Sequence, residues 1–160
     1  MGLDMYLRAK KFVSSYSFNE GRENDLYDRV IDSVGAHNIV SPDTHHAEVS
    51  VNVAYWRKAN AIHNWFVTNC QDGVDDCGTY YVSRDSLIEL RDTCKAVLED
   101  NALATELLPP QEGFFFGGTE IDEYYLYSVQ ETHDRLNKLL EEVQEEGGKS
   151  GWSFEYQSSW

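Results

Sequence analysis

The sequence has few basic residues, few cysteines and no long hydrophobic run. Only 13 lysines and arginines stand against 28 aspartates and glutamates, so the 160-residue chain has a formal net charge of −15 at pH 7. Because phosphate contacts need Lys and Arg, this balance argues against direct binding to nucleic acid or to an anionic membrane. No stretch approaches the roughly 20 apolar residues that cross a bilayer. The acidity favours a protein partner with a basic surface, or serves only solubility.

Cysteine is scarce. Cys70, Cys77 and Cys94 are odd in number and do not have the close spacing of a metal-binding motif, so neither a disulfide framework nor a zinc site is predicted. The first residues, MGLDMYLRAKK, lack the apolar run of a secretion signal. Both observations are typical of a protein in a reducing compartment, and they predict a cytoplasmic location.

Motifs that would name a reaction or a cofactor are missing as well. The sequence has no GxSxG, HExxH, CxxC or P-loop pattern. His45 and His46 are adjacent in a predicted strand and point to opposite faces, so they do not share a metal ion. Asp72, Asp75 and Asp76 lack the ligand spacing and the closing glutamate of an EF-hand. We therefore predict no metal and no cofactor, and the sequence leaves open whether the protein is an enzyme.

The clearest pattern in the chain is the stretch from residue 45 to residue 70. Residues 45–55 alternate with period two, which predicts a half-buried strand. The predicted core face of this strand carries His45, Ala47, Val49, Val51, Val53 and Tyr55. From Trp56 onward the apolar residues recur with helical spacing, which predicts a helix over 56–70. Large and charged side chains then crowd this strand–helix junction.

Similar patterns predict the other elements. Period-two alternation predicts strands over 3–13, 79–83 and 152–156, and helical spacing of apolar residues predicts helices over 24–34, 84–99 and 120–144. Residue types place helix N-caps at Asn24, Ser83 and Thr119. We therefore predict one α+β domain over residues 1–160. It has a mixed or antiparallel sheet of about four strands, with three to four helices packed on one face.

A histidine lies in the middle of the apolar stripe of the helix predicted at 56–70. His63 is either a neutral core residue whose ring nitrogens are hydrogen-bonded, or a site residue whose pKa is shifted by burial. Both interpretations stay open from the sequence alone.

One functional hypothesis is a site for a small anionic or nucleotide-like ligand at the strand–helix junction. Trp56 would stack on the ligand, Arg57 would hold its anionic group, and His63 would transfer a proton. The other candidates are Asn60 on the same helix, Asp4 and Arg8 on the first strand, and Glu48 on the central strand. If the two strands are neighbours, their polar residues would line one surface. An ordinary solvated sheet face with ion pairs is the alternative interpretation.

A second hypothesis, which the composition favours, is binding to a protein without catalysis. An acidic cluster at the end of the last predicted helix would offer a patch to a basic partner. It consists of Glu141, Glu142, Glu145 and Glu146. The chain is also rich in aromatic residues, including the run GFFFG at 113–117. That run is predicted to be a short strand or an ordered loop, and it would pack in the core or form the wall of a ligand site.

Several strings in the sequence support a resemblance. The start MGLDMYL, the segment YWRKANAIHNWF, the run GFFFG and the end SSW resemble a family of small uncharacterised proteins of bacteriophages and prophages. The likeness spans most of the chain. It implies expression inside a bacterial host, where accessory phage proteins of this size often bind and redirect a host protein, including defence systems. The resemblance implies no catalytic residues, because no reaction is assigned to that family.

Overall fold

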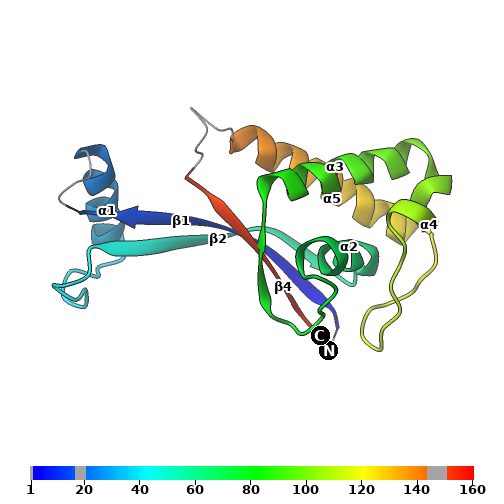
Figure 1. Cartoon of the computed structure of the whole chain (residues 1–160), viewed down its shortest axis with the longest axis horizontal. Coiled ribbons are helices and arrows are strands. Elements are labelled where there is room, and N and C mark those ends of the chain that lie inside the picture. Colours follow the sequence, from blue (N-terminus) through cyan, green and yellow to red (C-terminus); the bar gives the residue numbers. More distant parts are fainter. Residues whose placement is uncertain (1, 17–20, 144–150) are drawn as a thin grey trace. The chain divides into compact units, whose positions relative to one another are not determined.

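The computed structural model describes residues 2–16, 21–143 and 151–160 (Figure 1). The strands are β1 (Asp4–Ser14), β2 (His46–Arg57), β3 (Thr79–Val82) and β4 (Ser153–Ser159). The helices are α1 (Gly21–Ser33), α2 (Asn60–Cys70), α3 (Arg84–Glu99), α4 (Ala104–Leu107) and α5 (Glu123–Glu142), with a short 3₁₀ helix, η1 (Asn101–Leu103), before α4.

The four strands form one antiparallel sheet in the order β2-β1-β4-β3. The register of β3 and β4 places Tyr80 of β3 opposite Tyr156 of β4. The first strand of the chain therefore lies in the middle of the sheet, beside both the second and the last. The α+β fold class predicted from the sequence is confirmed.

The chain divides into two compact units, and each has its own core. The first unit comprises Met1–Ala9 and Asn52–Trp160, and the second comprises Lys10–Val51. Both β1 and β2 begin in one unit and end in the other. The core of the second unit is small, and it consists of Val13, Tyr27, Ile31 and Ala36 with four partly buried neighbours.

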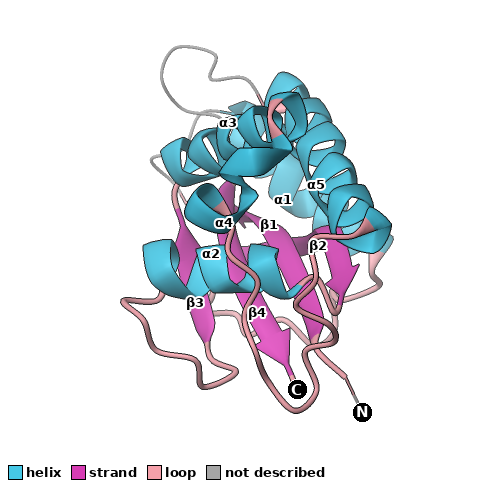
Figure 2. Ribbon diagram, turned by 90° about the vertical axis from the view of Figure 1, so that its right-hand side faces the viewer, coloured by secondary structure: helices cyan, strands magenta, loops and turns pink. Residues whose placement is uncertain are grey.

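The first unit has the larger core, on one face of its part of the sheet. Leu3, Met5 and Leu7 of β1 are fully buried, because side chains at alternate positions of a strand point to the same face. Helices α2, α3 and α5 cover this face (Figure 2), and Phe66 of α2 stacks on Tyr156 of β4 at 4.0 Å between ring centroids. The prediction of helices on one face is thus confirmed within this unit.

For the last residues of β2, the prediction of which side chains face the core is wrong. Tyr55 is 45% exposed and Val51 is equally exposed, whereas Trp56 is 2% exposed. Ala47 and Val49 are partly buried as predicted, so the burial alternation changes phase along β2. A phase change of one residue moves all later side chains to the opposite face.

The junction itself also differs from the prediction. Strand β2 continues to Arg57, and α2 begins at Asn60 rather than at Trp56. Between them Lys58 has a φ of 56°, in the left-handed region that residues other than glycine seldom adopt. This single left-handed residue lets the chain turn from strand to helix with almost no loop.

The predicted helix starts are partly right. Ser83 caps α3 by accepting a hydrogen bond from the backbone of Ser86, as predicted. Asn24 lies inside α1, which starts at Gly21, so its predicted capping role is wrong. Helix α5 is capped by Asp122 instead of Thr119. An aspartate three residues further along is an equally good cap, so residue preference alone did not decide between the two positions.

Candidate ligand pocket at the strand–helix junction

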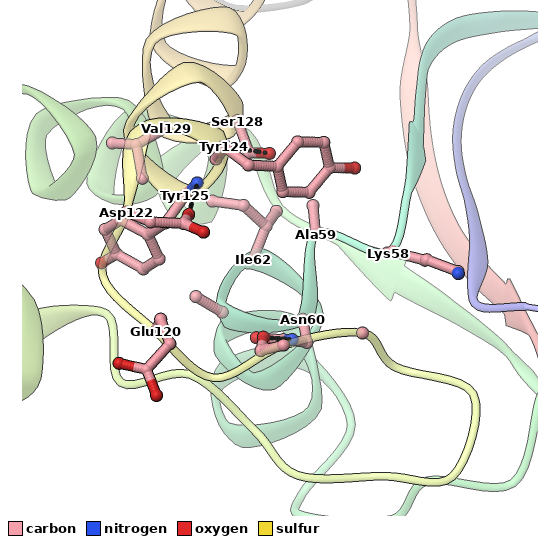
Figure 3. A pocket seen from close by; sticks show the side chains of 13 residues that line it. Lys58, Ala59, Asn60, Ile62, Glu120, Asp122, Tyr124, Tyr125, Ser128 and Val129 are labelled. Carbon is pink, nitrogen blue, oxygen red and sulfur yellow. Dashed lines mark hydrogen bonds between the residues drawn. The ribbon is translucent and has the colours of Figure 1, made fainter.

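A pocket of about 250 Å³ lies in the first unit where the N-terminal ends of α2 and α5 meet the loop before α5 (Figure 3). We call it the junction pocket. It is lined by Lys58, Ala59, Asn60, Ala61, Ile62, Gly117, Gly118, Glu120, Asp122, Tyr124, Tyr125, Ser128 and Val129. Ile62 and Val129 are each 1% exposed, so the apolar part of the wall belongs to the core.

The buried amide of Asn60 holds the loop that forms one wall, together with the backbone nitrogen of Leu3, which donates to the Phe115 carbonyl at 3.1 Å. Asn60 is 5% exposed, and its side-chain nitrogen donates to the carbonyl oxygens of Phe116 at 3.1 Å and Gly118 at 2.8 Å. Its side-chain oxygen accepts a hydrogen bond from the backbone nitrogen of Gln111 at 3.3 Å. A buried amide with donors and acceptor all paired has one orientation, so the wall is fixed relative to α2.

The turn at Lys58 brings the same loop close to the end of β2. The backbone nitrogen of Lys58 donates to Leu3 at 2.8 Å, which ties the turn to β1. Gly117 has a φ of 90°, and a side chain there would come within 3.4 Å of the Lys58 Cβ. This distance is an ordinary van der Waals contact, so glycine suits the position because of its backbone conformation. Figure 3 shows the Lys58 ammonium group turned away from the other lining residues.

The start of α5 provides most of the polar groups in the pocket. One carboxylate oxygen of Asp122 caps the helix by accepting from the Tyr125 backbone at 2.9 Å. Tyr124 donates to the Arg57 carbonyl at 2.6 Å, and Tyr125 donates to the Leu108 carbonyl at 2.8 Å. Burial raises the pKa of the Tyr125 phenol well above its ordinary value, so this group stays a hydrogen-bond donor.

The start of α2 has a different character. Its N-cap position is Ala59, and no side chain in the described part of the chain caps it. The first backbone N–H groups of α2 therefore lie at the pocket wall without a side-chain acceptor. Together the two helix ends give the pocket a floor of apolar side chains, with backbone donors on one side and a carboxylate on the other.

His63 lies one turn beyond the pocket wall and is fully buried. Its Nδ1 hydrogen-bonds with the Tyr156 hydroxyl at 2.7 Å, and its Nε2 with the Asp75 carboxylate at 3.0 Å. The other oxygen of Asp75 accepts from the Trp160 indole at 3.0 Å. Burial raises the pKa of Tyr156 well above its ordinary value. This geometry matches the interpretation of His63 as a core histidine with both ring nitrogens satisfied.

Trp56 also faces the core. Its indole nitrogen donates to the Thr132 hydroxyl of α5 at 2.8 Å, and its ring lies 6.0 Å from that of Phe66. With only 2% of its surface exposed, Trp56 has no face on which a ligand would stack. The structure therefore does not support the stacking role predicted for it.

Three of the predicted ligand-binding residues lie on the sheet face opposite the helices, where Arg57 pairs with Asp4 and Arg8 pairs with residues of β4. Asp4 accepts a hydrogen bond from Tyr55 at 2.5 Å and lies 3.6 Å from the Arg57 guanidinium. Arg8 donates to Gln157 at 2.9 Å. The hydrogen bond to Asp4 is the main reason why the pKa of Tyr55 is raised. These contacts form a solvated sheet face with cross-strand pairs, which was the alternative interpretation of these residues.

The remaining predicted residues lie elsewhere. Glu48 belongs to the second unit, where it forms an ion pair with Lys10 at 2.7 Å. Glu141 and Glu142 are exposed at the end of α5, whereas Glu145 and Glu146 lie outside the described residues. In the ranges that the structure describes, no group of three His, Cys, Asp or Glu residues is placed to hold a metal ion. No helix there is sufficiently long and apolar to pass through a bilayer.

Of the predicted site residues that the structure describes, only Asn60 lines the junction pocket. The sequence reasoning missed the wall that residues 117–128 provide. Two signals were available: the Gly117–Gly118 pair directly after the phenylalanine run, and an aspartate just before a helical pattern. Neither indicates which distant element the loop faces.

Comparisons of the chain with models of known protein families, with curated proteins and with solved structures find no match. The resemblance to phage proteins therefore stays a prediction, and the function has to be argued from the pocket and the surface.

Proposed function

We propose that the protein binds a small organic ligand in the junction pocket. The observation that supports this proposal is the pocket itself, which has a mixed lining and a fixed wall. A volume of about 250 Å³ corresponds to roughly eight water molecules at about 30 Å³ each, which suits a ligand of about 8 to 12 non-hydrogen atoms. Small-molecule sites typically combine such apolar walls with a few placed polar groups.

The rigidity of the wall strengthens this proposal. Asn60 fixes the loop through Phe116 and Gly118, and Tyr124 fixes the start of α5 to the end of β2. A preformed pocket loses little conformational entropy when a ligand enters, so binding energy is not spent on ordering the site. The phenol of Tyr125 is held as a donor, and this supports binding rather than proton transfer.

Filling the pocket tests the proposal. Gly118 lines the pocket, and a Cβ at this position meets no heavy atom of the described chain within 4 Å. Gly118→Leu should therefore occupy the pocket with little effect on stability. Gly21→Leu is the matched control, because Gly21 is equally open and lies in the other unit. Ligands found by NMR or thermal-shift screening should lose binding to Gly118→Leu and keep it with Gly21→Leu. Binding that survives Gly118→Leu would refute the proposal.

We also propose, as a second candidate, that the protein binds a host protein with a basic surface. A second hollow of about 250 Å³, which we call the tyrosine groove, lies beside the junction pocket. It is lined by Tyr55, Trp56, Arg57, Ala59, Tyr124, Tyr127, Ser128 and Glu131. Tyr55, Tyr124 and Tyr127 are 45%, 54% and 63% exposed, and tyrosine and arginine are common anchors of protein interfaces. The net charge of −15 would attract a basic partner.

Capture from bacterial lysate tests this second candidate when it is combined with variants. Tyr127→Ala should abolish capture of the partner, whereas Ile39→Ala should not, because Ile39 is an even more exposed apolar residue but lies in the other unit. Capture should weaken as salt is raised from 50 to about 300 mM, since surface charges are then screened. A partner retained equally by both variants would not use the tyrosine groove.

A further inference from the structure

We infer that the ligand of the junction pocket carries a protonated amine that contacts Asp122, and a compact apolar body that contacts Ile62 and Val129. This inference rests on the proposed function, because it names the chemical class of ligand for the same pocket. It is based on the orientation of the charged side chains that line the pocket (Figure 3).

The carboxylate of Asp122 is oriented for a ligand. One of its oxygens caps α5 through the Tyr125 backbone at 2.9 Å, which fixes the side chain. Figure 3 shows the carboxylate turned toward the space beside Ile62. Because each carboxylate oxygen has more than one acceptor position, Asp122 retains capacity for a further N–H donor. A charged N–H donor such as an ammonium group makes a stronger hydrogen bond to a carboxylate than a neutral donor does.

The other two charged residues of the lining do not compete for this position. Figure 3 shows that the Glu120 carboxylate points away from Asp122 and that the Lys58 ammonium is turned away from the pocket. Lys58 therefore does not neutralise Asp122 there. The local charge that faces the ligand is negative, and the net charge of −15 has the same sign. Both favour a cationic group beside Asp122, whereas the uncapped backbone donors at the start of α2 suit a carboxylate on another part of the same ligand.

The apolar part of the lining sets the size of the ligand body. Ala59, Ala61, Ile62 and Val129 are each at most 6% exposed, and they form a continuous surface with the tyrosine rings of α5. Burying a branched alkyl group of four or five carbons there would use this surface fully. With its amine such a group has about five or six non-hydrogen atoms, so the 8 to 12 that the pocket volume allows leave room for a further polar group such as a carboxylate.

Three probes with the same branched body test the ligand class: 3-methylbutylamine, leucine and 3-methylbutanoate. Only the first two carry an amine, and only the last two carry a carboxylate. Titration followed by NMR should show binding of both amines, and 3-methylbutanoate should bind at least about tenfold more weakly. If leucine binds more tightly than 3-methylbutylamine, the ligand is an amino acid whose carboxylate also has a partner. Equal affinity indicates a simple amine.

Variants at the two carboxylates provide the matched comparison. Asp122→Asn keeps the helix cap, because asparagine caps as well as aspartate, but it removes the charge. It should weaken amine binding about tenfold. This is the lower end of the range expected for the loss of a charged hydrogen bond, because the site is open to solvent. Glu120→Gln removes the same charge from a side chain that points away, and should change the affinity less than twofold. Binding of 3-methylbutylamine should also fall above the pKa of about 10.4 that is usual for an alkyl ammonium group.

The outcomes separate this inference from the proposed function. One outcome is a compound that loses binding to Gly118→Leu but has no amine, or that binds Asp122→Asn as tightly as the natural protein. In that case the pocket is a ligand site, and the inferred class of ligand is wrong. If neither the three probes nor a screen of small compounds yields binding sensitive to Gly118→Leu, the proposed function is wrong and the inference fails with it.

Discussion

Replacing His63 by phenylalanine tests the buried network that joins α2 to β4. Phenylalanine keeps the ring, but it leaves the hydroxyl of Tyr156 and one side of the Asp75 carboxylate without their partner. Tyr156 is fully buried, so the unpaired hydroxyl costs about 1–3 kcal/mol. Asp75 keeps its hydrogen bond from the Trp160 indole and is partly exposed. Losing the hydrogen bond between Asp75 and His63 therefore costs about 1–2 kcal/mol of stability after solvent screening. The free energy of unfolding should therefore fall by about 2–5 kcal/mol.

Urea unfolding followed by tryptophan fluorescence measures this loss, provided that the m-value is unchanged. The double variant His63→Phe with Tyr156→Phe removes the unpaired hydroxyl together with its partner. It should be more stable than the sum of the two single changes predicts, by roughly 1–2 kcal/mol. A loss below about 1 kcal/mol for His63→Phe, or strict additivity in the double variant, would refute the reasoning that these hydrogen bonds stabilise the fold.

Three further predictions concern the core and the pocket wall. Asn60→Ala should lower the free energy of unfolding by about 2–4 kcal/mol and free the 111–118 loop, seen as faster amide exchange at Phe116. Trp56→Phe should cost about 1–2 kcal/mol in urea unfolding, and Trp56→Phe with Thr132→Val should cost less than the sum of the single changes. Burial raises the pKa of the Cys94 thiol to about 12, above the value of the unfolded chain. Stability from this group is therefore complete below about pH 8.5 and is lost as the pH rises toward 12, and Cys94→Ala should flatten the fall in unfolding free energy above pH 9.

Hydrophobic periodicity predicted the class of fold and most elements because it reports on burial within one element. The strand at β1 alternates regularly, and its burial follows the alternation. In β2 the same reasoning failed beyond Val49, because the burial pattern changes phase along the strand at a place that the residue types do not indicate. The helix predicted from Trp56 shows the same limit. Its apolar spacing fits a helix, yet Lys58 adopts a left-handed conformation that no local pattern indicates.

The candidate site was harder to predict because its walls are far apart in the sequence. Asn60 and Gly118 are separated by 58 positions, and only the fold brings them within hydrogen-bonding distance. From the sequence alone, the Gly117–Gly118 pair indicates a loop. That this loop forms a pocket wall depends on its hydrogen bond with the Asn60 side chain. Asp122 similarly reads as a helix cap, and its orientation toward the pocket is visible only in three dimensions.

The geometry of the strand–helix junction explains why residues that were predicted to form one ligand site lie on different surfaces of the structure. Successive residues there point in different directions: Trp56 enters the core, Arg57 joins the open sheet face, and Lys58 turns out of the pocket. A strand that passes into a helix through one left-handed residue distributes its side chains over several surfaces. Asn60, the first residue of α2, donates to two carbonyls of the loop before α5. The pocket therefore forms beside the junction, and this amide fixes the part of the loop that lines it.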